Sequence, residues 1–526
     1  MQRRFGLLQR LLVLLVGVLC SAGLAVLALL LWPLPDMPRP GVAGDFLIHN
    51  VAVVDVAAGR VLPDRHVIVR RGRVENIARA GAETDTDTVS LTLIDGTGRF
   101  LLPGLWDMHT HTTKHAGQYQ HPLFVANGVT GVRELWGCMS EPDSFFGCAA
   151  DRNRWNAAVA RGDYLAPRYV RHSSFQINGG NEVPEGYPDF FRARDAEEAQ
   201  ALVDFHAGQG GDFLKPYTEL PVAPYLALAE AARKRGLTLE GHRPIKVSLP
   251  QALAAGQRSI EHARLFLLEC FAGAAEFRAA PDPLRAYTRD LRQRLLDEQD
   301  PERCRRLMSA MADSETWWSP TLQTLKMGAL ADDPAYRHDK RLVFVPYLYR
   351  TLMWMPDADR KAKENRHADG RKVNAELYAL ALSQVGEAHA LGVKLLAGTD
   401  AFDTYVFPGF SLHDELADLV DAGLSPADAL RAATIDAARF SGRADEFGSI
   451  EAGKVADLVL LDANPLEEIR NTRKVAAVFL NGRFLDRAAL DELLAFAERQ
   501  AGSVQHNLHI FWAALRSPLL RVQFAD

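Results

Sequence analysis

Short segments typical of β-strands alternate with longer segments typical of helices through the centre of the chain, and this alternation restricts the possible folds more than any other feature. Helical patterns span, for example, residues 196–209, 224–235 and 375–391. The strand-like segments lie at residues 101–109, 131–135, 168–173, 212–215, 237–242, 258–261, 317–321 and 393–398. Eight strands alternating with helices predict an α/β fold, a (β/α)8 TIM barrel over residues 101–440, with its functional groups at the carboxyl ends of the strands. A helical insertion expected around residues 270–374 could cover the barrel mouth.

Both flanks of this central region have a different pattern. Short apolar runs punctuated by Gly and Asp fill residues 46–102, and similar runs return at residues 448–484, where Asn481-Gly482 is typical of a hairpin turn. We therefore expect a small composite β-sandwich domain built from residues 45–100 and 441–490. Residues 491–526 form a C-terminal extension to which the sequence assigns no role.

The first forty residues differ from the rest. An uncharged stretch of 22 residues, 11–32, would form a helix of about 33 Å, enough to cross a hydrocarbon core of about 30 Å. It predicts an N-terminal transmembrane helix. A cleaved signal peptide is the alternative, because the small residues Ser21, Ala22 and Gly23 could form a cleavage site.

The charges around this stretch predict its orientation. Three arginines precede it, namely Arg3, Arg4 and Arg10, and only Arg39 follows within twenty residues. The positive-inside rule then keeps the short tail in the cytoplasm and the folded mass on the periplasmic or extracellular side, or secreted if the helix is cleaved. A proline-rich spacer completes residues 1–40.

Composition excludes several classes of protein. With 60 Lys and Arg against 66 Asp and Glu, 48% hydrophobic and 24% charged residues, the chain is an ordinary globular protein with no charge pattern for nucleic acid. One span cannot form a transport pathway. The five cysteines show no zinc-finger spacing. Cys138 with Cys148, and Cys270 with Cys304, could pair in an oxidising compartment or remain free buried thiols.

Metal-ligand residues gather at the ends of the predicted strands. Asp107, His109 and His111 follow an apolar run, and the two-residue period of a strand points all three to one face, where two imidazoles can share a divalent cation. Further ligand-type residues end or follow later strands: Lys215, His242, His262 and Asp400. Because a barrel brings these strand ends together, the sequence predicts a metal site there.

These residues resemble the metal-dependent amidohydrolase superfamily, and within it the branch of Xaa-Pro dipeptidases and imidazolonepropionases. The resemblance covers roughly residues 46–486 and includes the segments 128–133, 260–262, 398–400, 432–434 and 448–462 besides the ligands named above. It implies that His109 and His111 hold one zinc ion, that His242 and His262 hold a second, and that Lys215, carboxylated by carbon dioxide, bridges them. Asp400 would bind metal and carry the proton from a bridging hydroxide to the leaving nitrogen.

The predicted function is hydrolysis of a C–N bond in a small molecule such as a dipeptide, an N-acyl amino acid or a cyclic amide. Hydrolysis of a lactone, ester or phosphotriester by the same site is an alternative. A non-catalytic binding protein on the same barrel is an alternative of another class. The sequence leaves open the metal's identity and the oligomeric state.

Some residues depart from the family pattern. The segment Asn178-Gly179-Gly180-Asn181 stands where relatives often have a histidine, and Arg243-Pro244 follows His242. The substrate is therefore not carried over. Three polar residues could bind a carboxylate or an oxyanion, or could simply fix loops: His172, Tyr217 and Arg243. We expect Arg133 and Glu134 to support the barrel mouth through a salt bridge, and residues 413–416 to be structural.

Overall fold

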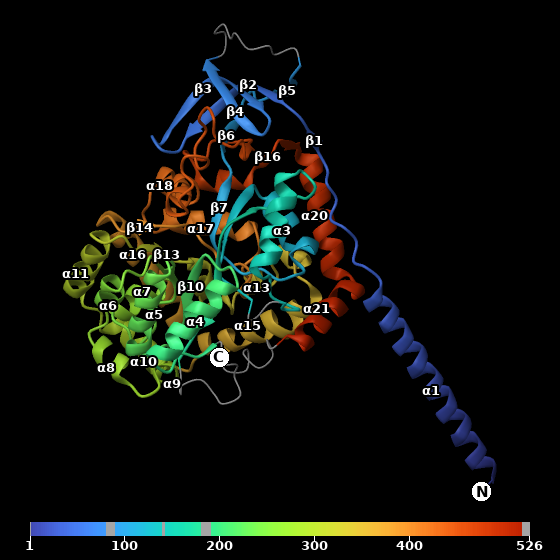
Figure 1. The fold of residues 1–526 in the computed structure, drawn as a ribbon. Helices are drawn as coiled ribbons and strands as arrows, with labels where there is room; N and C mark the ends of the chain where they lie inside the picture. The colour runs from blue at the N-terminus through green and yellow to red at the C-terminus, as the bar shows by residue number, and fades with distance from the viewer. Residues whose placement is uncertain (1, 80–89, 139–141, 180–190, 518–526) are drawn as a thin grey trace.

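A computed structural model describes residues 2–79, 90–138, 142–179 and 191–517. Figure 1 shows a sheet of early strands at one end of the molecule, a larger helical body next to it, and a single helix that projects away from the body. The described residues form two sheets, and the candidate site lies at the central one.

The central sheet has eight parallel strands whose spatial order follows the chain. They are β7 (Leu105–Thr110), β8 (Val129–Glu134), β9 (Arg168–Ile177), β10 (Phe213–Pro216), β11 (Thr238–Gly241), β12 (Ser259–Glu261), β13 (Trp317–Ser319) and β14 (Lys394–Leu395). A strand therefore lies in each of the eight places where the sequence predicts one. The first crossovers carry η1 (Ala116–Gln118), α2 (Gln120–Ala126), α3 (Ala149–Ala160), α4 (Ala196–Gly208), α5 (Val222–Lys234) and α6 (Leu249–Ala254).

This sheet curls, so that its first strand approaches the chain that follows its last strand. The backbone N–H of Met108 donates to the carbonyl of Ala397 at 2.9 Å, and the N–H of Asp400 donates to the carbonyl of His109 at 2.9 Å. The curl brings Asp400 to the end of β7, although the two lie far apart in the sequence.

The predicted strand at residues 101–109 is two strands in two sheets, which corrects that prediction. β6 (Phe100–Pro103) pairs antiparallel with β15 (Leu458–Leu461), and β7 begins at Leu105. Gly104 separates them, and a side chain there would collide with the side chain of Thr130. An unbroken apolar run hides this break from a sequence reading.

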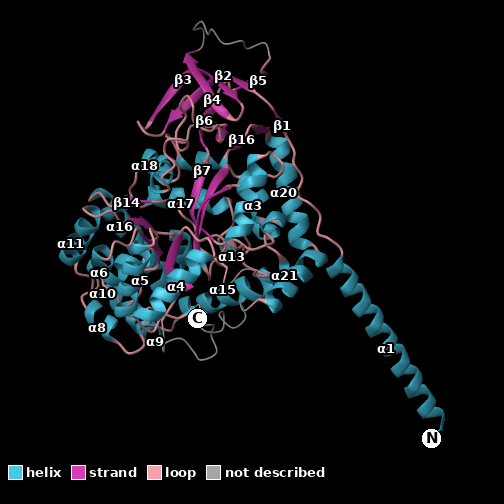
Figure 2. Ribbon diagram, viewed as in Figure 1, coloured by secondary structure: helices cyan, strands magenta, loops and turns pink. Residues whose placement is uncertain are grey.

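The second sheet has nine strands drawn from both flanks of the chain. Besides β6 and β15 it contains β1 (Val42–Ala43), β2 (Phe46–Asp55), β3 (Arg60–Arg70), β4 (Arg73–Arg79), β5 (Thr92–Asp95), β16 (Val475–Leu480) and β17 (Arg483–Leu485). β16 and β17 form the expected antiparallel hairpin, and both turn residues, Asn481 and Gly482, have positive φ, as a type I′ turn requires. Figure 2 shows these strands at the end of the molecule away from most helices.

The helical stretch expected around residues 270–374 is divided by β13 into two blocks. Before β13 lie α7 (Arg264–Glu269), α8 (Ala274–Ala279), α9 (Pro283–Ala286), α10 (Arg289–Asp297) and α11 (Pro301–Ala312). After it lie α12 (Leu322–Leu330), α13 (Pro334–Arg337), η3 (Lys340–Phe344), α14 (Tyr347–Tyr349), η4 (Arg350–Trp354), α15 (Met355–Asn365) and α16 (Val373–Ala390). Within the first block, the disulfide Cys270–Cys304 links the end of α7 to α11. A second disulfide, Cys138–Cys148, closes a loop after β8.

The C-terminal part adds five helices, α17 (Phe410–Asp421), α18 (Pro426–Ala432), α19 (Ile435–Phe440), α20 (Arg487–Gly502) and α21 (Val504–Arg516), and the short η5 (Ile469–Arg473). Residues 413–416 lie within α17, where the buried His413 ring bonds the carbonyl of Asn127 at 3.0 Å. This contact fits the structural role expected for the segment.

The projecting helix is α1 (Gln2–Leu31). Its segment Leu11–Leu31 is long and apolar enough to cross a membrane, and none of it is buried against the body. Length and composition fit a membrane span and a signal sequence equally.

Candidate functional site

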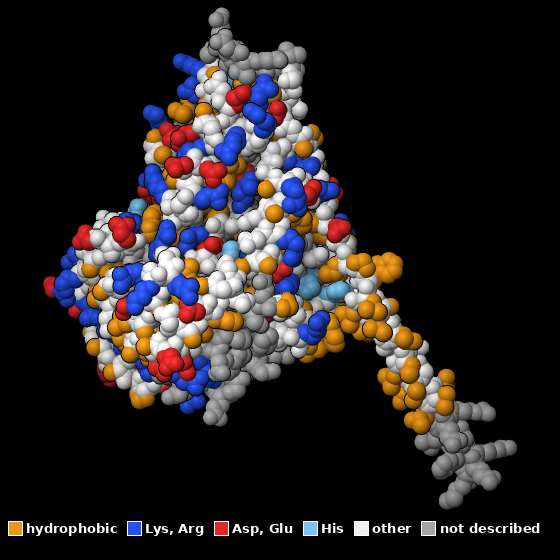
Figure 3. Space-filling model, in the orientation of Figure 1, with side chains coloured by type: hydrophobic (Ala, Val, Ile, Leu, Met, Phe, Trp, Pro, Cys, Tyr) orange, Lys and Arg blue, Asp and Glu red, His pale blue; other side chains and the backbone are white. Residues whose placement is uncertain are grey.

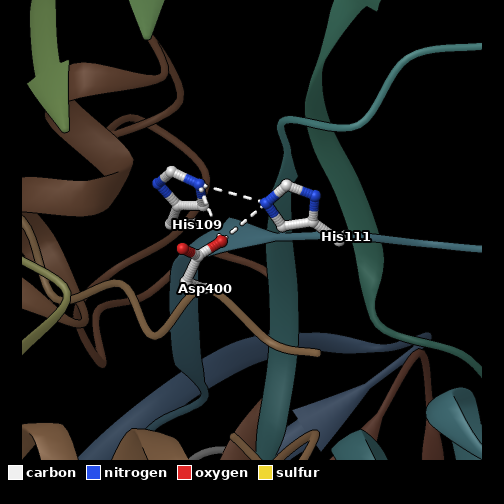
Figure 4. A group of neighbouring side chains, drawn as sticks. All are labelled: His109, His111 and Asp400. Carbon is white, nitrogen blue, oxygen red and sulfur yellow. Dashed lines mark hydrogen bonds and ion pairs between the residues drawn. The ribbon is translucent and has the colours of Figure 1, made fainter. Parts of the chain in front are cut away.

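His109, His111 and Asp400 form a compact group at the end of β7 (Figure 4). Oδ1 of Asp400 lies 2.6 Å from Nε2 of His111 and 3.2 Å from Nε2 of His109. The two Nε2 atoms are 3.3 Å apart. The strand alternation brings both rings to one face, as the sequence predicts, and the curled sheet supplies the carboxylate. Two imidazoles and a carboxylate at these distances are a donor set for a divalent cation.

Buried carboxylates fix this group from behind. Nδ1–H of His109 donates to Oε2 of Glu261 at 2.9 Å, and Nη2 of Arg133 lies 2.9 Å from the same carboxylate. The carboxylate of Asp107 accepts from the Thr399 hydroxyl at 2.6 Å, and burial raises its pKa to about 7. Asp107 therefore holds the chain before Asp400 in place.

A second pair of histidines lies beside the first group. Nε2 of His242 and Nε2 of His262 are 2.9 Å apart, and each Nδ1 is held by a threonine hydroxyl, Thr218 at 2.9 Å and Thr321 at 2.8 Å. The rings of His109 and His262 are 5.0 Å apart. Burial lowers the pKa of His262 to about 3 and that of His242 well below its usual value. Both rings are therefore neutral, the form that binds metals.

Lys215 lies at the end of β10 in the same cavity. Its buried Nζ donates to the carbonyl of Leu135 at 2.8 Å, and burial lowers the pKa of the amine to about 8. A much larger share of the side chain is therefore neutral at pH 7 than for an exposed lysine. The neutral amine is the form that can react with carbon dioxide to give a carbamate.

One cavity of about 240 Å³ connects these side chains. Five of the six predicted ligands line it, and the sixth, His109, lies fully buried beside them. A second cavity of about 270 Å³ shares the wall formed by Tyr217, His242, His262 and Arg264. It continues along the apolar side chains of Leu265, Leu268, Leu284 and Tyr287.

The three candidates for substrate binding have different surroundings. Tyr217 lines both cavities, and its ring stacks on His242 with centroids 4.4 Å apart. Arg243 lines the second cavity, but its guanidinium is buried against the carbonyls of its own loop and lies 3.3 Å from Glu269.

His172 is not brought to the site. Its ring bonds the carbonyl of Gly210 at 2.8 Å and lies 3.1 Å from Asp212, and it is not among the described residues that line either cavity. It fixes the loop before β10. Of the segment that departs from the family pattern, Asn178 lies beside Glu219, and Gly180 and Asn181 lie outside the described residues.

Sequence reasoning missed several residues around the cavity. Arg264, two positions after His262, lines both cavities, and Trp136, Phe402 and Asp403 line the first. Only nearness in sequence to a predicted ligand could have indicated Arg264, Phe402 and Asp403.

Arg133 and Glu134 support the site through salt bridges with other partners rather than with each other. Arg133 pairs with Glu240 at 3.2 Å and with Glu261 at 2.9 Å. Glu134 pairs with Arg152 at 3.3 Å, and all of these groups are buried.

Comparison with known proteins supports the family predicted from the sequence. Residues 350–485 match the model of the Amidohydrolase family, which confirms the resemblance and the enzyme class predicted from the sequence. No curated protein matches the chain.

Solved structures share the fold over most of the chain. A bottromycin amidohydrolase is 24% identical and has a TM-score of 0.66, with 89% of this chain and 92% of that chain covered. A Xaa-Pro dipeptidase with bound methionine in the active site is 20% identical with a TM-score of 0.58, covering 84% of this chain and all of the other. A prolidase complexed with N-methylphosphonate-L-proline is 17% identical with a TM-score of 0.55, covering 84% and 99%.

Proposed function

We propose that this protein is a two-metal hydrolase of C–N bonds. Residues 350–485 match the Amidohydrolase family, and the chain has an amidohydrolase-type fold. One observation carries the proposal: six ligand-type side chains from strand ends far apart in the sequence meet around a single cavity. Structural side chains are seldom collected in this way, because burying several ionisable groups together is costly unless they bind something.

The donors suit two divalent ions. His109, His111 and Asp400 would hold the first, and His242 and His262 the second, with a carboxylated Lys215 between them. The imidazoles of His242 and His262 are neutral. Burial opposes ionisation of Asp400, but the nearby His109 and His111 hold the pKa of its carboxyl well below the usual value. When bound, the ions would polarise the scissile carbonyl and make a water nucleophilic. Zinc is the ion we expect.

Asp400 is the residue best placed to move the proton. Its Oδ1 contacts His111, and its Oδ2 lies 3.6 Å from Nδ1 of His262, so its carboxylate reaches both histidine groups. We assign to Asp400 acceptance of the proton from the attacking water and its return to the leaving nitrogen.

The cavity supports a small substrate with an amino-acid part. Arg264 offers a guanidinium at the junction of the two cavities, and an apolar wall continues beyond it. A guanidinium suits a substrate carboxylate, and the apolar wall suits a side chain or an acyl group. A dipeptide, an N-acyl amino acid or a cyclic amide fits these features, and two structural neighbours hold methionine and a proline phosphonate.

We further infer that the curled sheet closes as a (β/α)8 barrel over residues 101–440, and that residues 45–100 and 441–490 form one small domain on the nine-stranded sheet. We infer that α1 anchors the protein and that the body lies outside the cytoplasm. The disulfides Cys138–Cys148 and Cys270–Cys304 support this location, because such bonds persist in oxidising compartments.

Metal content and turnover of the full-length protein test the proposal. We expect about two metal ions per chain by elemental mass spectrometry, and turnover of members of a dipeptide and N-acyl amino acid library. Asp400→Asn should abolish turnover while the fold, monitored by circular dichroism, is retained. Little bound metal, or full turnover in Asp400→Asn, would overturn the proposal. Metal with turnover only of lactones or phosphotriesters would overturn the C–N specificity.

A further inference from the structure

The last described helix, α21, is apolar on two opposite faces. His506, Ile510 and Ala513 are buried and hold the helix on the body. The opposite face carries a line of large apolar side chains, Val504, Leu508, Phe511, Trp512 and Leu515. At 100° per residue these five positions fall within a stripe of about 100°, the width that a helix normally buries. We call these five residues the α21 stripe.

Four residues of the α21 stripe are exposed, and Leu508 is half-buried between them. Val504 is 69% exposed, and Phe511, Trp512 and Leu515 are each exposed by nearly half. A second segment, residues 343–355, adds the exposed side chains of Val343, Tyr347, Leu352 and Met355. Elsewhere in the described body after residue 40, exposed large apolar side chains are scattered singly, at Val42, Leu93, Leu226 and Leu284. Single exposed apolar residues are ordinary, whereas a gathered set indicates an interaction surface.

One edge of the α21 stripe adjoins the end of α1. Nε2 of Gln505 donates to the carbonyls of Trp32 at 2.8 Å and Leu29 at 3.2 Å, and the His509 ring bonds the Leu29 carbonyl at 3.1 Å. The last carbonyls of a helix have no partner within it, so these contacts cap α1 and fix it to α21. In Figure 3 hydrophobic side chains run along α1 and continue onto the edge of the body that it joins.

The other edge adjoins the segment at residues 343–355. The N–H of Leu348 donates to Oδ1 of Asn507 at 2.8 Å. The α21 stripe thus lies between the end of α1 and α14, and Tyr347 of α14 and Leu352 of the following η4 are exposed as well.

We propose that the α21 stripe and the exposed side chains of α14 and η4 lie in the surface of the phospholipid bilayer that α1 crosses. This inference rests on the proposed anchor. If α1 spans the hydrocarbon, its capped end lies at the lipid–water interface, and α21 lies at the same level. Trp and Phe on an amphipathic helix suit that interface, where such helices sink by about 5–10 Å. Exposed Trp32 and Trp512 both fit the aromatic belt.

The proposed surface adjoins the catalytic cavity. Met353 of η4 lines the cavity, next to the exposed Leu352, and Tyr349 and Trp354 pack on Phe402, with ring centroids 4.7 and 6.0 Å apart. The same short segment therefore has one side in the site wall and the other at the membrane.

A fluorescent probe tests the inference in the full-length chain in phosphatidylcholine–phosphatidylglycerol vesicles. Cys20 is the free cysteine of the described residues, so in a Cys20→Ala background Phe511→Cys can be labelled alone. Leu226→Cys in α5 is the matched control, because Leu226 is similarly exposed, at 42%, but stands outside both apolar segments. A probe on native Cys20, near the middle of the apolar stretch, reports whether α1 is inserted when the lipids carry a nitroxide deep in the acyl chain.

Lipids that carry a nitroxide near the headgroup should remove about half of the fluorescence at position 511 and leave position 226 unchanged. Quenching at Cys20 without quenching at 511 would overturn the inference and leave the anchor standing. Quenching at neither position would overturn the anchor and the inference together. Energy transfer between labelled copies at 511, without lipid quenching, would mean that a second copy covers the stripe and would likewise overturn it.

Discussion

Nδ1 of His109 lies 2.9 Å from Oε2 of Glu261, and this hydrogen bond decides which ring nitrogen His109 turns toward Asp400. When the ring is neutral and Nδ1–H donates to the carboxylate, the lone pair is on Nε2, which faces the other donors of the candidate metal site. Arg133 keeps Glu261 ionised. Burial by itself raises the pKa of this carboxyl, but Arg133 and His109 lower the pKa by more, to about 2.

Replacing Glu261 should therefore weaken metal binding without removing a ligand. In Glu261→Gln we expect metal affinity to fall by about 10–100-fold, as is typical when the partner of a ligating histidine is lost. Competition with a chelating dye measures it. Glu240→Gln is the matched control, because Glu240 also pairs with Arg133 but does not contact His109. Equal losses in the two variants would mean that Arg133, and not the bond to His109, accounts for the effect.

Lys215 should give a pH dependence to reactivation of the metal-depleted protein by zinc and carbon dioxide. Only the neutral amine reacts with carbon dioxide, and burial lowers the pKa of Lys215 to about 8. The neutral fraction therefore rises about tenfold from pH 6 to 7, about fivefold from 7 to 8, and levels off above. The carbon dioxide-dependent rate of reactivation, measured with dissolved carbon dioxide held at the same concentration at every pH and assayed after transfer to one pH, should follow this curve.

Lys215→Met keeps a side chain of similar length without an amine and should not be reactivated at any pH. With dissolved carbon dioxide held constant, a reactivation rate that does not depend on carbon dioxide, or that falls as the pH rises from 6 to 8, contradicts the carbamate.

Arg264 should select substrates with a free carboxylate. Losing a charge-assisted hydrogen bond at this partly solvated position should cost about 1.5 kcal/mol, which is about tenfold in kcat/KM. We expect Arg264→Met to show this loss, mainly through KM, on a dipeptide and not on its C-terminal amide. Arg285→Met is the control, because Arg285 is a nearby exposed arginine that lines neither of the two cavities. An equal loss on acid and amide would exclude carboxylate recognition by Arg264.

The residues of the candidate metal site could be predicted from the sequence because their placement follows from two periodic rules. Side chains two apart on a strand share a face, which joins His109 to His111, and the carboxyl ends of parallel strands meet at one edge, which brings in Lys215 and His242. Neither rule needs knowledge of the packing between distant segments.

The supporting contacts follow no such rule. Glu261 is 152 residues from His109 and 128 from Arg133, so a sequence reading names them separately but cannot join them. His172 lies on a strand at a plausible position, yet its ring turns to the loop at Gly210. The break at Gly104 depends on the close approach of Thr130, which belongs to another strand.

The disulfide Cys270–Cys304 should stabilise the helical block that forms part of the cavity wall. It links the end of α7, whose Leu265 and Leu268 line the second cavity, to α11. Closing a loop with a sequence separation of 34 residues restricts the unfolded chain, and the corresponding stabilisation is about 4 kcal/mol.

The double variant Cys270→Ser, Cys304→Ser should lose about this much unfolding free energy, measured as a lower guanidinium midpoint. Cys20→Ser removes the exposed free thiol of α1 and should leave the midpoint unchanged. A midpoint equal to that of wild type in the double variant would show that these cysteines do not pair. The proposed location outside the cytoplasm would then lose one of the two disulfides that support it.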